Sequence, residues 1–211
     1  MKKTTLYKIE NDTAQTRIHI DDPNAPAKVA DKLGRHLEHV DKGRPVILLC
    51  IGSDRSTGDS LGPLIGSGVE SLDQNFFRVY GTLAQPVHAT NLQEAMETIS
   101  RKYADPFIIA VDACLGRLES VGCVNIAAGA LRPGAGVKKE LPPVGDVHIT
   151  GVVNVGGFME FTVLQNTRLN MVMRISDVVC TGLRLLASQQ RPPVITEPGL
   201  HEAGIAGTQA I

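Results

Sequence analysis

Apolar runs and helical repeats alternate along most of the chain. Residues 46–51 and 107–111 are apolar throughout and bounded by turn residues, which is typical of strands buried on both faces of a parallel sheet. Further strands are predicted at 76–83, 122–127 and 147–155. Apolar residues at helical spacing predict helices at 25–40, from about residue 60, at 92–103, and as one long helix or two over 158–188. This alternation predicts a three-layer α/β/α fold with a mostly parallel central sheet.

The same pattern divides the chain into three parts. We expect a polar N-terminal arm or short edge element at 1–24, one α/β domain at 25–189 and a Pro- and Gly-containing tail at 190–211. No stretch reaches the roughly 20 apolar residues of a membrane span. Charged residues follow Lys2 and Lys3 before any apolar segment, so a secretory signal is not expected. These features predict a cytoplasmic protein that does not associate with membranes.

Composition narrows the classes of function. The 21 Lys and Arg residues against 22 Asp and Glu residues give a net charge of −1, which argues against a nucleic-acid partner. Aromatic residues are only 4% of the chain, so few rings are present to stack on bases. The four cysteines lack the paired close spacings of a zinc site, and we expect them to be reduced thiols: Cys50, Cys114, Cys123 and Cys180.

In open α/β sheets, ligands bind beyond the carboxyl ends of the strands. The loop at 52–58 follows the first buried strand, but it is not a phosphate-binding loop. Gly52 and Gly58 are separated by five residues, and the next residue is Asp59, where a P-loop would have Lys. A carboxylate there repels phosphate, and the dinucleotide fingerprint GxGxxG is also absent. Nucleotide binding is therefore disfavoured.

Two aspartates mark this edge of the predicted sheet. Asp59 follows the loop after the first buried strand, and Asp112 directly follows the strand at 107–111. Neighbouring strands lie about 4.8 Å apart, so the two carboxyl groups can come close and share a proton. Such a pair can activate water with one carboxylate and donate a proton from the other. The alternatives are that Asp59 caps a helix, that Asp112 caps a loop, or that the pair holds a divalent metal.

Other polar residues near this edge are candidates for substrate contacts. His88 follows the second strand, where it can contact substrate or carry a proton, or simply be a hydrogen-bonded loop residue. Asp54 and Arg55 either hold substrate or are surface charges of the loop. A thiol nucleophile made of Cys114 and His88 is disfavoured, because the flanking acids raise the thiol pKa.

Several motifs resemble those of a known family. The segment CIGSDRSTGDSLGP at 50–63 resembles the signature of the YyaC-type sporulation proteins, often labelled spore proteases. Further matches are GTL and PVHA within 81–89, VDACLG at 111–116, RPGAGV at 132–137 and GVVNVGGFME at 151–160. The resemblance extends from about residue 45 to residue 188.

That family is similar in turn to the spore germination protease and to the hydrogenase-maturation endopeptidases, which implies a HybD-like hydrolase fold. Asp59 in DSLGP and Asp112 in the pair Asp112-Ala113 match the proposed catalytic acids of the germination protease. The maturation enzymes contact nickel through a His, and the residue at that position here is Asn154, a weak neutral ligand. The resemblance therefore implies no metal and no cofactor.

We therefore expect an endopeptidase acting on a protein or peptide during sporulation or germination, in the forespore or mother cell. Asp59 and Asp112 would be catalytic, with substrate contacts from Asp54, Arg55, His88 and Asn154. Two alternatives stay open: a non-catalytic peptide- or protein-binding protein with the same fold, and a metal-dependent maturation-type peptidase. Homo-oligomer formation also stays open.

Overall fold

One six-stranded sheet organises the molecule. The computed structural model describes residues 16–41, 43–72, 74–133 and 141–190. The strand order is β1-β5-β6-β4-β2-β3. β2 pairs in parallel with β3 and β4, and β4 pairs in parallel with β6, whereas β5 is antiparallel to both β6 and β1. The strands are β1 (Thr16–His19), β2 (Val46–Cys50), β3 (Phe77–Tyr80), β4 (Phe107–Gly116), β5 (Cys123–Ala128) and β6 (Val147–Val155).

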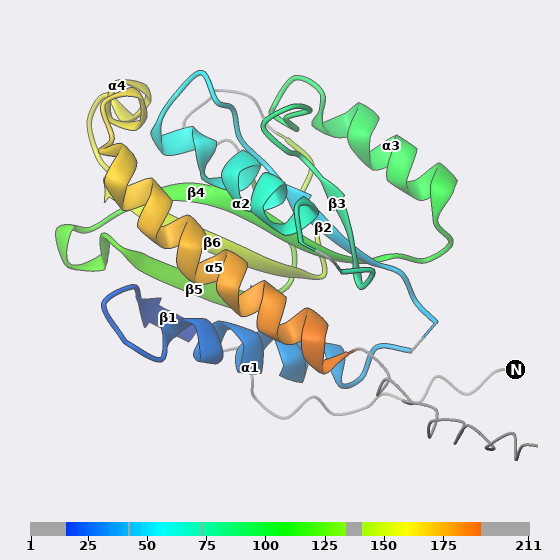
Figure 1. Cartoon of the computed structure of the whole chain (residues 1–211). Helices are drawn as coiled ribbons and strands as arrows, with labels where there is room; N and C mark the ends of the chain where they lie inside the picture. The colour runs from blue at the N-terminus through cyan, green and yellow to red at the C-terminus, as the bar shows by residue number, and fades with distance from the viewer. Residues whose placement is uncertain (1–15, 42, 73, 134–140, 191–211) are drawn as a thin grey trace, which may run out of the picture.

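Helices cover both faces of this sheet (Figure 1). α1 (Ala25–Leu37), α2 (Leu61–Glu70) and α5 (Leu169–Gln189) pack on one face, and α3 (Leu92–Lys102) packs on the other. The alternation of β2 shows why both layers form. Leu48 and Cys50 point into the α1, α2 and α5 side, while Ile47 and Leu49 point toward α3. The expected three-layer fold with a mostly parallel sheet is confirmed.

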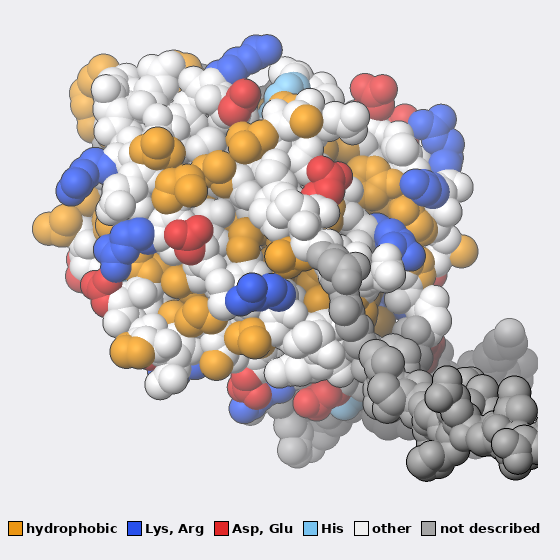
Figure 2. All heavy atoms as spheres, viewed as in Figure 1, with side chains coloured by type: hydrophobic (Ala, Val, Ile, Leu, Met, Phe, Trp, Pro, Cys, Tyr) orange, Lys and Arg blue, Asp and Glu red, His pale blue; other side chains and the backbone are white. Residues whose placement is uncertain are grey.

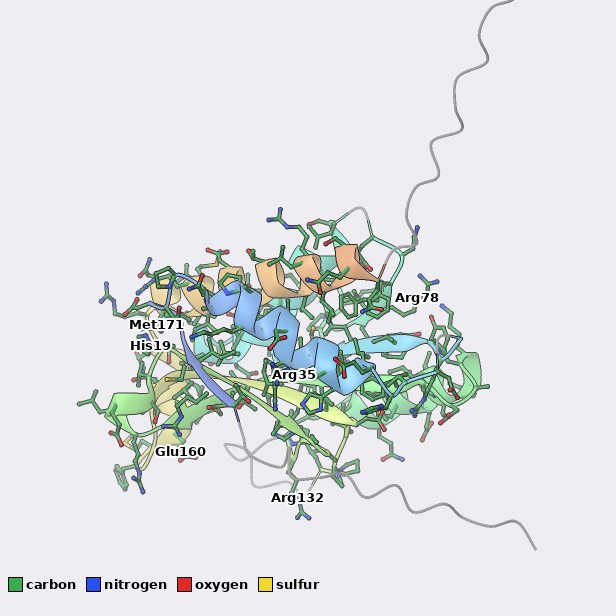
Figure 3. The ribbon with its side chains drawn as sticks, turned by 90° about the horizontal axis from the view of Figure 1, so that it is seen from below. His19, Arg35, Arg78, Arg132, Glu160 and Met171 are labelled. Atoms are coloured by element: carbon green, nitrogen blue, oxygen red, sulfur yellow. The ribbon has the colours of Figure 1, made fainter. Side chains whose placement is uncertain are left out.

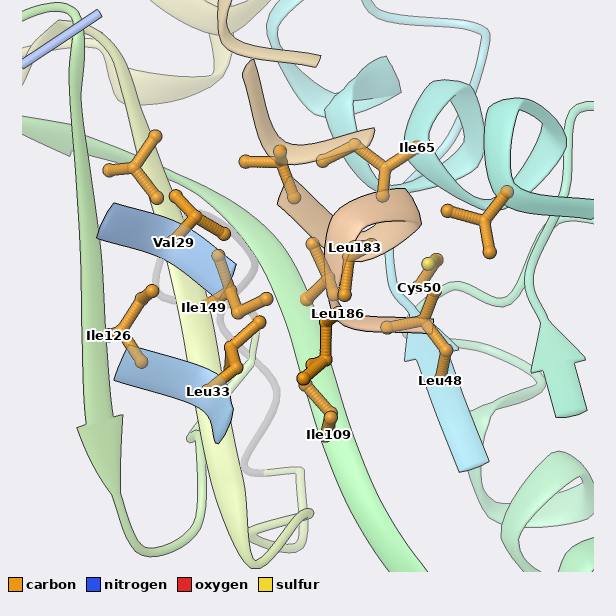
Figure 4. Close-up of a cluster of buried hydrophobic side chains, with 14 of the residues drawn as sticks. Val29, Leu33, Leu48, Cys50, Ile65, Ile109, Ile126, Ile149, Leu183 and Leu186 are labelled. Carbon is orange, nitrogen blue, oxygen red and sulfur yellow. The ribbon is translucent and has the colours of Figure 1, made fainter. Parts of the chain in front are cut away.

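The larger core lies between the sheet and the pair formed by α1 and α5 (Figure 4). Leu33 of α1 and Leu186 of α5 are fully buried there against Ile109 and Ile149 of the sheet. Burial of each such side chain contributes about 1.5–3 kcal/mol. The close approach of the two helices depends on Gly182, because a Cβ there would lie 2.6 Å from Val29 Cγ1.

The end of β4 differs from the sequence expectation. β4 was expected to end at Asp112 but runs to Gly116, because β6 continues beside it and supplies hydrogen-bond partners. The segment 158–188, expected to form one long helix or two, forms two, α4 (Glu160–Gln165) and α5. Two short 3-10 helices complete the described elements, η1 (Gly58–Ser60) and η2 (Leu118–Ser120).

The part of the chain expected to be an arm contains β1, a short strand at the edge of the sheet. Residues 1–15 of that arm and nearly all of the expected tail (191–211) lie outside the described residues, as do residues 134–140 of the RPGAGV region. Figure 2 shows acidic and basic side chains interspersed with apolar ones on the face formed by α1 and α5. None of the described helices is long and apolar enough to cross a membrane.

Candidate active site

A cavity of about 390 Å³ lies at the end of the sheet where β4 extends past β2. The last pair between these strands is Cys50 with Val111, and β4 continues for five more residues. Asp59 and Asp112 both line the cavity, together with His88 and Arg55. The sheet therefore brings residues that are far apart in the sequence, from Arg55 to Asp112, to one cavity.

The loops after β2 and β3 are tied to each other, which fixes His88 at the cavity. Ile51 forms a parallel bridge with Val87, and the Gly52 N–H donates to the Val87 carbonyl at 2.8 Å. The His88 N–H donates to Asn91 Oδ1 at 2.8 Å, and Thr90 Oγ1 lies 2.8 Å from His88 Nδ1. These contacts hold both the backbone and the imidazole ring of His88 in place.

The loop that carries Asp59 folds back tightly on itself. Gly52 has φ 144°, and a Cβ there would lie 2.0 Å from the Asp59 backbone oxygen. That oxygen accepts a hydrogen bond from the Ser53 N–H at 3.0 Å. Asp59 lies within η1, and the N-cap position of α2 is Ser60, with no side-chain capping bond. The helix-cap explanation for Asp59 is therefore wrong.

Asp112 is the more buried of the two acids, with 8% of its surface exposed. The Ala113 N–H donates to its Oδ1 at 2.8 Å. Burial raises the pKa of Asp112 well above its usual range, and the charge of Asp59 raises it further, against the opposing Ala113 hydrogen bond. Of the two carboxyls, Asp112 is accordingly the one whose protonated form is favoured more by its surroundings.

Asp59 is only partly buried and has a different balance of forces. Burial raises its pKa, but the Ser53 backbone N–H and the nearby His88 both favour the charged form. The two environments therefore separate the two carboxyls, with Asp59 the stronger acid. This separation into one proton acceptor and one proton donor is what general acid–base chemistry requires.

Three residues that were not among the predicted site residues also line the cavity. Arg132 and Glu160 are charged residues of its lining, and in Figure 3 both lie on the opposite side of the view from α1 and α5. Thr150 lines the cavity next to Asp112, its partner in the pairing of β4 with β6. Arg132 lies in the RPGAGV motif, and Glu160 ends the motif at 151–160, so the family resemblance contained a signal for both.

Cys114 also lines the cavity, but it is a poor nucleophile. Burial raises the pKa of its thiol, a hydrogen bond with Thr150 lowers it, and the charge of Asp112 raises it. The thiolate is therefore disfavoured in this site. The sequence-based expectation that neighbouring acids raise the thiol pKa agrees with the raised pKa of Cys114.

Two residues expected to contact substrate lie elsewhere. Asp54 is exposed and does not line the cavity. Asn154 hydrogen-bonds to Thr167 Oγ1 at 3.2 Å and to the Val155 N–H at 2.8 Å. The pairing of β4 and β6 shifts register between Cys114 and Leu115, so Asn154 pairs with Leu115, where an unshifted register would place Val153. A sequence reading of strict alternation misses this bulge.

Most backbone N–H groups of the loop 52–58 are hydrogen-bonded within the protein, so few are left to stabilise an oxyanion. The N–H groups of Gly52, Ser53, Arg55 and Ser56 all donate to acceptors in this region. In the part of the chain that the structure describes, no group of three or more His, Cys, Asp or Glu side chains is placed to hold a metal ion.

The fold and the site together define an α/β protein in which two aspartates, Asp59 and Asp112, line a cavity at the carboxyl edge of a mostly parallel sheet. Residues 17–182 match the family described as "Protein of unknown function (DUF1256)", and the chain belongs to this family. It is 57% identical over 143 residues to "Uncharacterized protein YyaC" of Bacillus subtilis (strain 168), covering 68% of this chain and 70% of that protein. The resemblance drawn from the motifs is thereby confirmed.

Among solved structures, the chain is similar to a [NiFe] hydrogenase maturation protease, HycI from Thermococcus kodakarensis KOD1. The match has a TM-score of 0.45 and 16% sequence identity, and covers 67% of this chain and 92% of that one.

Proposed function

We propose that this protein is a peptidase in which Asp59 and Asp112 act as a pair on a peptide bond. The observation that supports this most is the shared cavity, in which the pKa values of both carboxyls are raised and that of Asp112 is raised further by the charge of Asp59. Pairs of acids in unlike environments are typical of hydrolytic sites.

In this mechanism Asp59 is the general base and takes a proton from the attacking water. Asp112 holds its proton and donates a hydrogen bond to the scissile carbonyl oxygen, which becomes negative as water adds. His88 favours the charged form of Asp59, so its role is to keep the base ionised. Collapse of the intermediate returns a proton to the leaving amine, and the pair is restored.

The biological setting is a finer proposal. The motifs at 50–63 and 111–116 resemble those of spore proteases, and we place the activity in sporulation or germination on that resemblance. If so, deletion of the gene in a spore-former changes the set of spore-protein N-termini. If the spore-protein N-termini are identical to those of the parent strain, the proposed role in sporulation or germination is contradicted, but the proposed peptidase chemistry is not.

The chemistry is tested with purified protein and a spore-protein extract, by mass spectrometry of newly formed N-termini. We expect Asp59→Asn and Asp112→Asn each to reduce cleavage about 1,000-fold, a typical loss for an essential acid or base. Asp54→Asn is the matched control, because this exposed aspartate lies in the same loop outside the cavity. Equal cleavage by all four proteins refutes the proposal.

A non-catalytic binding protein with the same fold is the second candidate. The apolar residues of the cavity favour it as much as they favour a peptidase, since Leu115, Leu131 and Leu141 all line it. The same experiment separates the two. Retention of extract proteins without new N-termini identifies a binding protein, and activity that is lost in a chelator identifies a metal-dependent enzyme.

A further inference from the structure

The edge of β4 beyond the end of β2 has backbone groups that no other described strand uses. β2 stops pairing at Val111, and the Ile51 N–H donates to the Val111 carbonyl at 2.7 Å. Backbone groups of successive strand residues point to opposite edges, so those of Ala113 and Leu115 point to the same side as Val111. The Gly116 carbonyl accepts from Gly156 on the β6 side, which agrees with this alternation.

Apart from the Ala113 N–H, the backbone groups on that side are available among the described residues. The Ala113 N–H is taken by the Asp112 carboxyl, and β4 from Asp112 onward pairs with β6 alone. Ala113 and Leu115 are only half-buried, and both line the cavity that holds the acid pair. An unpaired strand edge of this kind is a template for one more strand.

The apolar walls of the cavity lie on both faces of the sheet around this edge. Leu131 and Leu141 pack with the cluster on the α3 side, while Leu164 packs with the cluster on the side of α1, α2 and α5. Phe161 of α4 adds to the lining and is 60% exposed. Side chains of an added strand alternate between the two faces, and each face here has an apolar surface to receive one.

We infer that the substrate is an extended, apolar peptide segment that binds as an added strand along Ala113 to Gly116. This rests on the proposed peptidase function and names the substrate class of that site. The main chain of the segment hydrogen-bonds to the free carbonyl of Ala113 and to the N–H and carbonyl of Leu115. Two adjacent large apolar side chains fill the two walls, and the bond to be cut lies where the added strand passes Asp112 and Asp59. A folded domain cannot enter in this way, so the substrate segment is unfolded or terminal.

The test uses fluorescein-labelled nonapeptides that have two adjacent leucines at the centre and only Thr, Ser and Gln at the flanking positions. The protein is full-length and carries Asp112→Asn to prevent cleavage. Single N-methyl groups are placed at each central position, and binding is followed by fluorescence anisotropy. We expect methylation at alternate positions to weaken binding about 5- to 10-fold, the value of a lost hydrogen bond, and methylation between them to change it less than about 2-fold. Loss that does not alternate, or no binding by any peptide, overturns the inference.

A second arm changes the protein. Phe161→Ser is expected to weaken the unmethylated peptide about 5- to 10-fold through lost apolar contact. Leu118→Ser is the matched control, because this residue is 76% exposed and does not line the cavity. Equal binding by both variants also overturns the inference.

Cleavage of the unmethylated peptide by the unmodified protein is recorded separately. Alternating methylation effects without cleavage keep the added-strand inference and refute the peptidase proposal. Cleavage without alternating methylation effects keeps the peptidase proposal and refutes the added-strand inference.

Discussion

The middle of the sheet and its carboxyl end differ in what they bury: apolar side chains in the middle, and ionisable side chains at the end. Around Leu48 and Ile109 every strand neighbour is present, and the side chains are apolar and fully buried. A few residues further along the same two strands, β2 leaves, β4 continues, and Asp112 is buried with a second acid nearby. The first region gains stability from burial, and the second gives some of it up by burying ionisable groups. A site of this kind needs the first region as its support.

The comparison predicts that damage to the core reduces stability without altering the chemistry. Leu33→Ala removes a fully buried side chain between α1 and the rest of the core. We expect a loss of about 3 to 5 kcal/mol in the free energy of unfolding, measured by urea denaturation. Cleavage per folded molecule should stay the same, since α1 contributes no residue to the cavity lining. A specific loss of cleavage in the folded fraction argues against this separation.

Gly52→Ala affects both regions, because the added Cβ meets the Asp59 backbone oxygen at 2.0 Å in a conformation that favours glycine. We expect a stability loss of about 2 to 3 kcal/mol from strain, together with loss of cleavage as Asp59 moves. Gly43→Ala is the control, because a Cβ there meets nothing within 4 Å. Crystal structures or amide spectra of both variants report whether η1 has shifted.

The pH dependence of stability follows from the raised pKa of Asp112. A carboxyl whose native pKa is raised stabilises the fold fully below its unfolded pKa, and that contribution is lost as pH rises through the native pKa. Asp112→Asn removes this pH-dependent loss of stability, because an amide does not ionise. The variant should therefore melt a few degrees above the parent protein at pH 8, and the difference should shrink toward pH 4. A difference in melting temperature that is constant with pH contradicts the buried-acid account.

The smallest effect is expected for Asp54→Asn in the same loop as Asp59. Asp54 is exposed, so its substitution should change the unfolding free energy by less than about 0.5 kcal/mol and leave cleavage unchanged. Chemical denaturation and the N-terminus assay check both. A large effect would mean that the loop, rather than the cavity, contacts substrate.

Apolar periodicity was enough to predict the layers and most elements. The strand at 147–155 was predicted with the bounds that it has, and the run at 46–51 differs from β2 by one residue. Buried parallel strands leave this strong signal because both their faces are apolar. Asp59 and Asp112 could be placed at one edge for the same reason.

The apolar pattern does not show which strands pair with one another or in what register. β4 extends past Asp112 because β6 lies beside it, and the register shift near Leu115 sets the place of Asn154. Both depend on a strand that is distant in sequence. Residues such as Thr150 and Phe161 reach the cavity through this tertiary arrangement, so their types alone gave no reason to select them.

The charge of Asp59 raises the pKa of Asp112, and this coupling between the two carboxyls can be measured directly. Carboxyl carbons labelled with ¹³C at aspartate report each pKa by NMR titration, with assignments from the single variants. We predict that Asp112 titrates above Asp59, and that Asp59→Asn lowers the pKa of Asp112 while Asp54→Asn leaves it unchanged. An Asp112 pKa that is the same in all three proteins would contradict the pairing of the two acids.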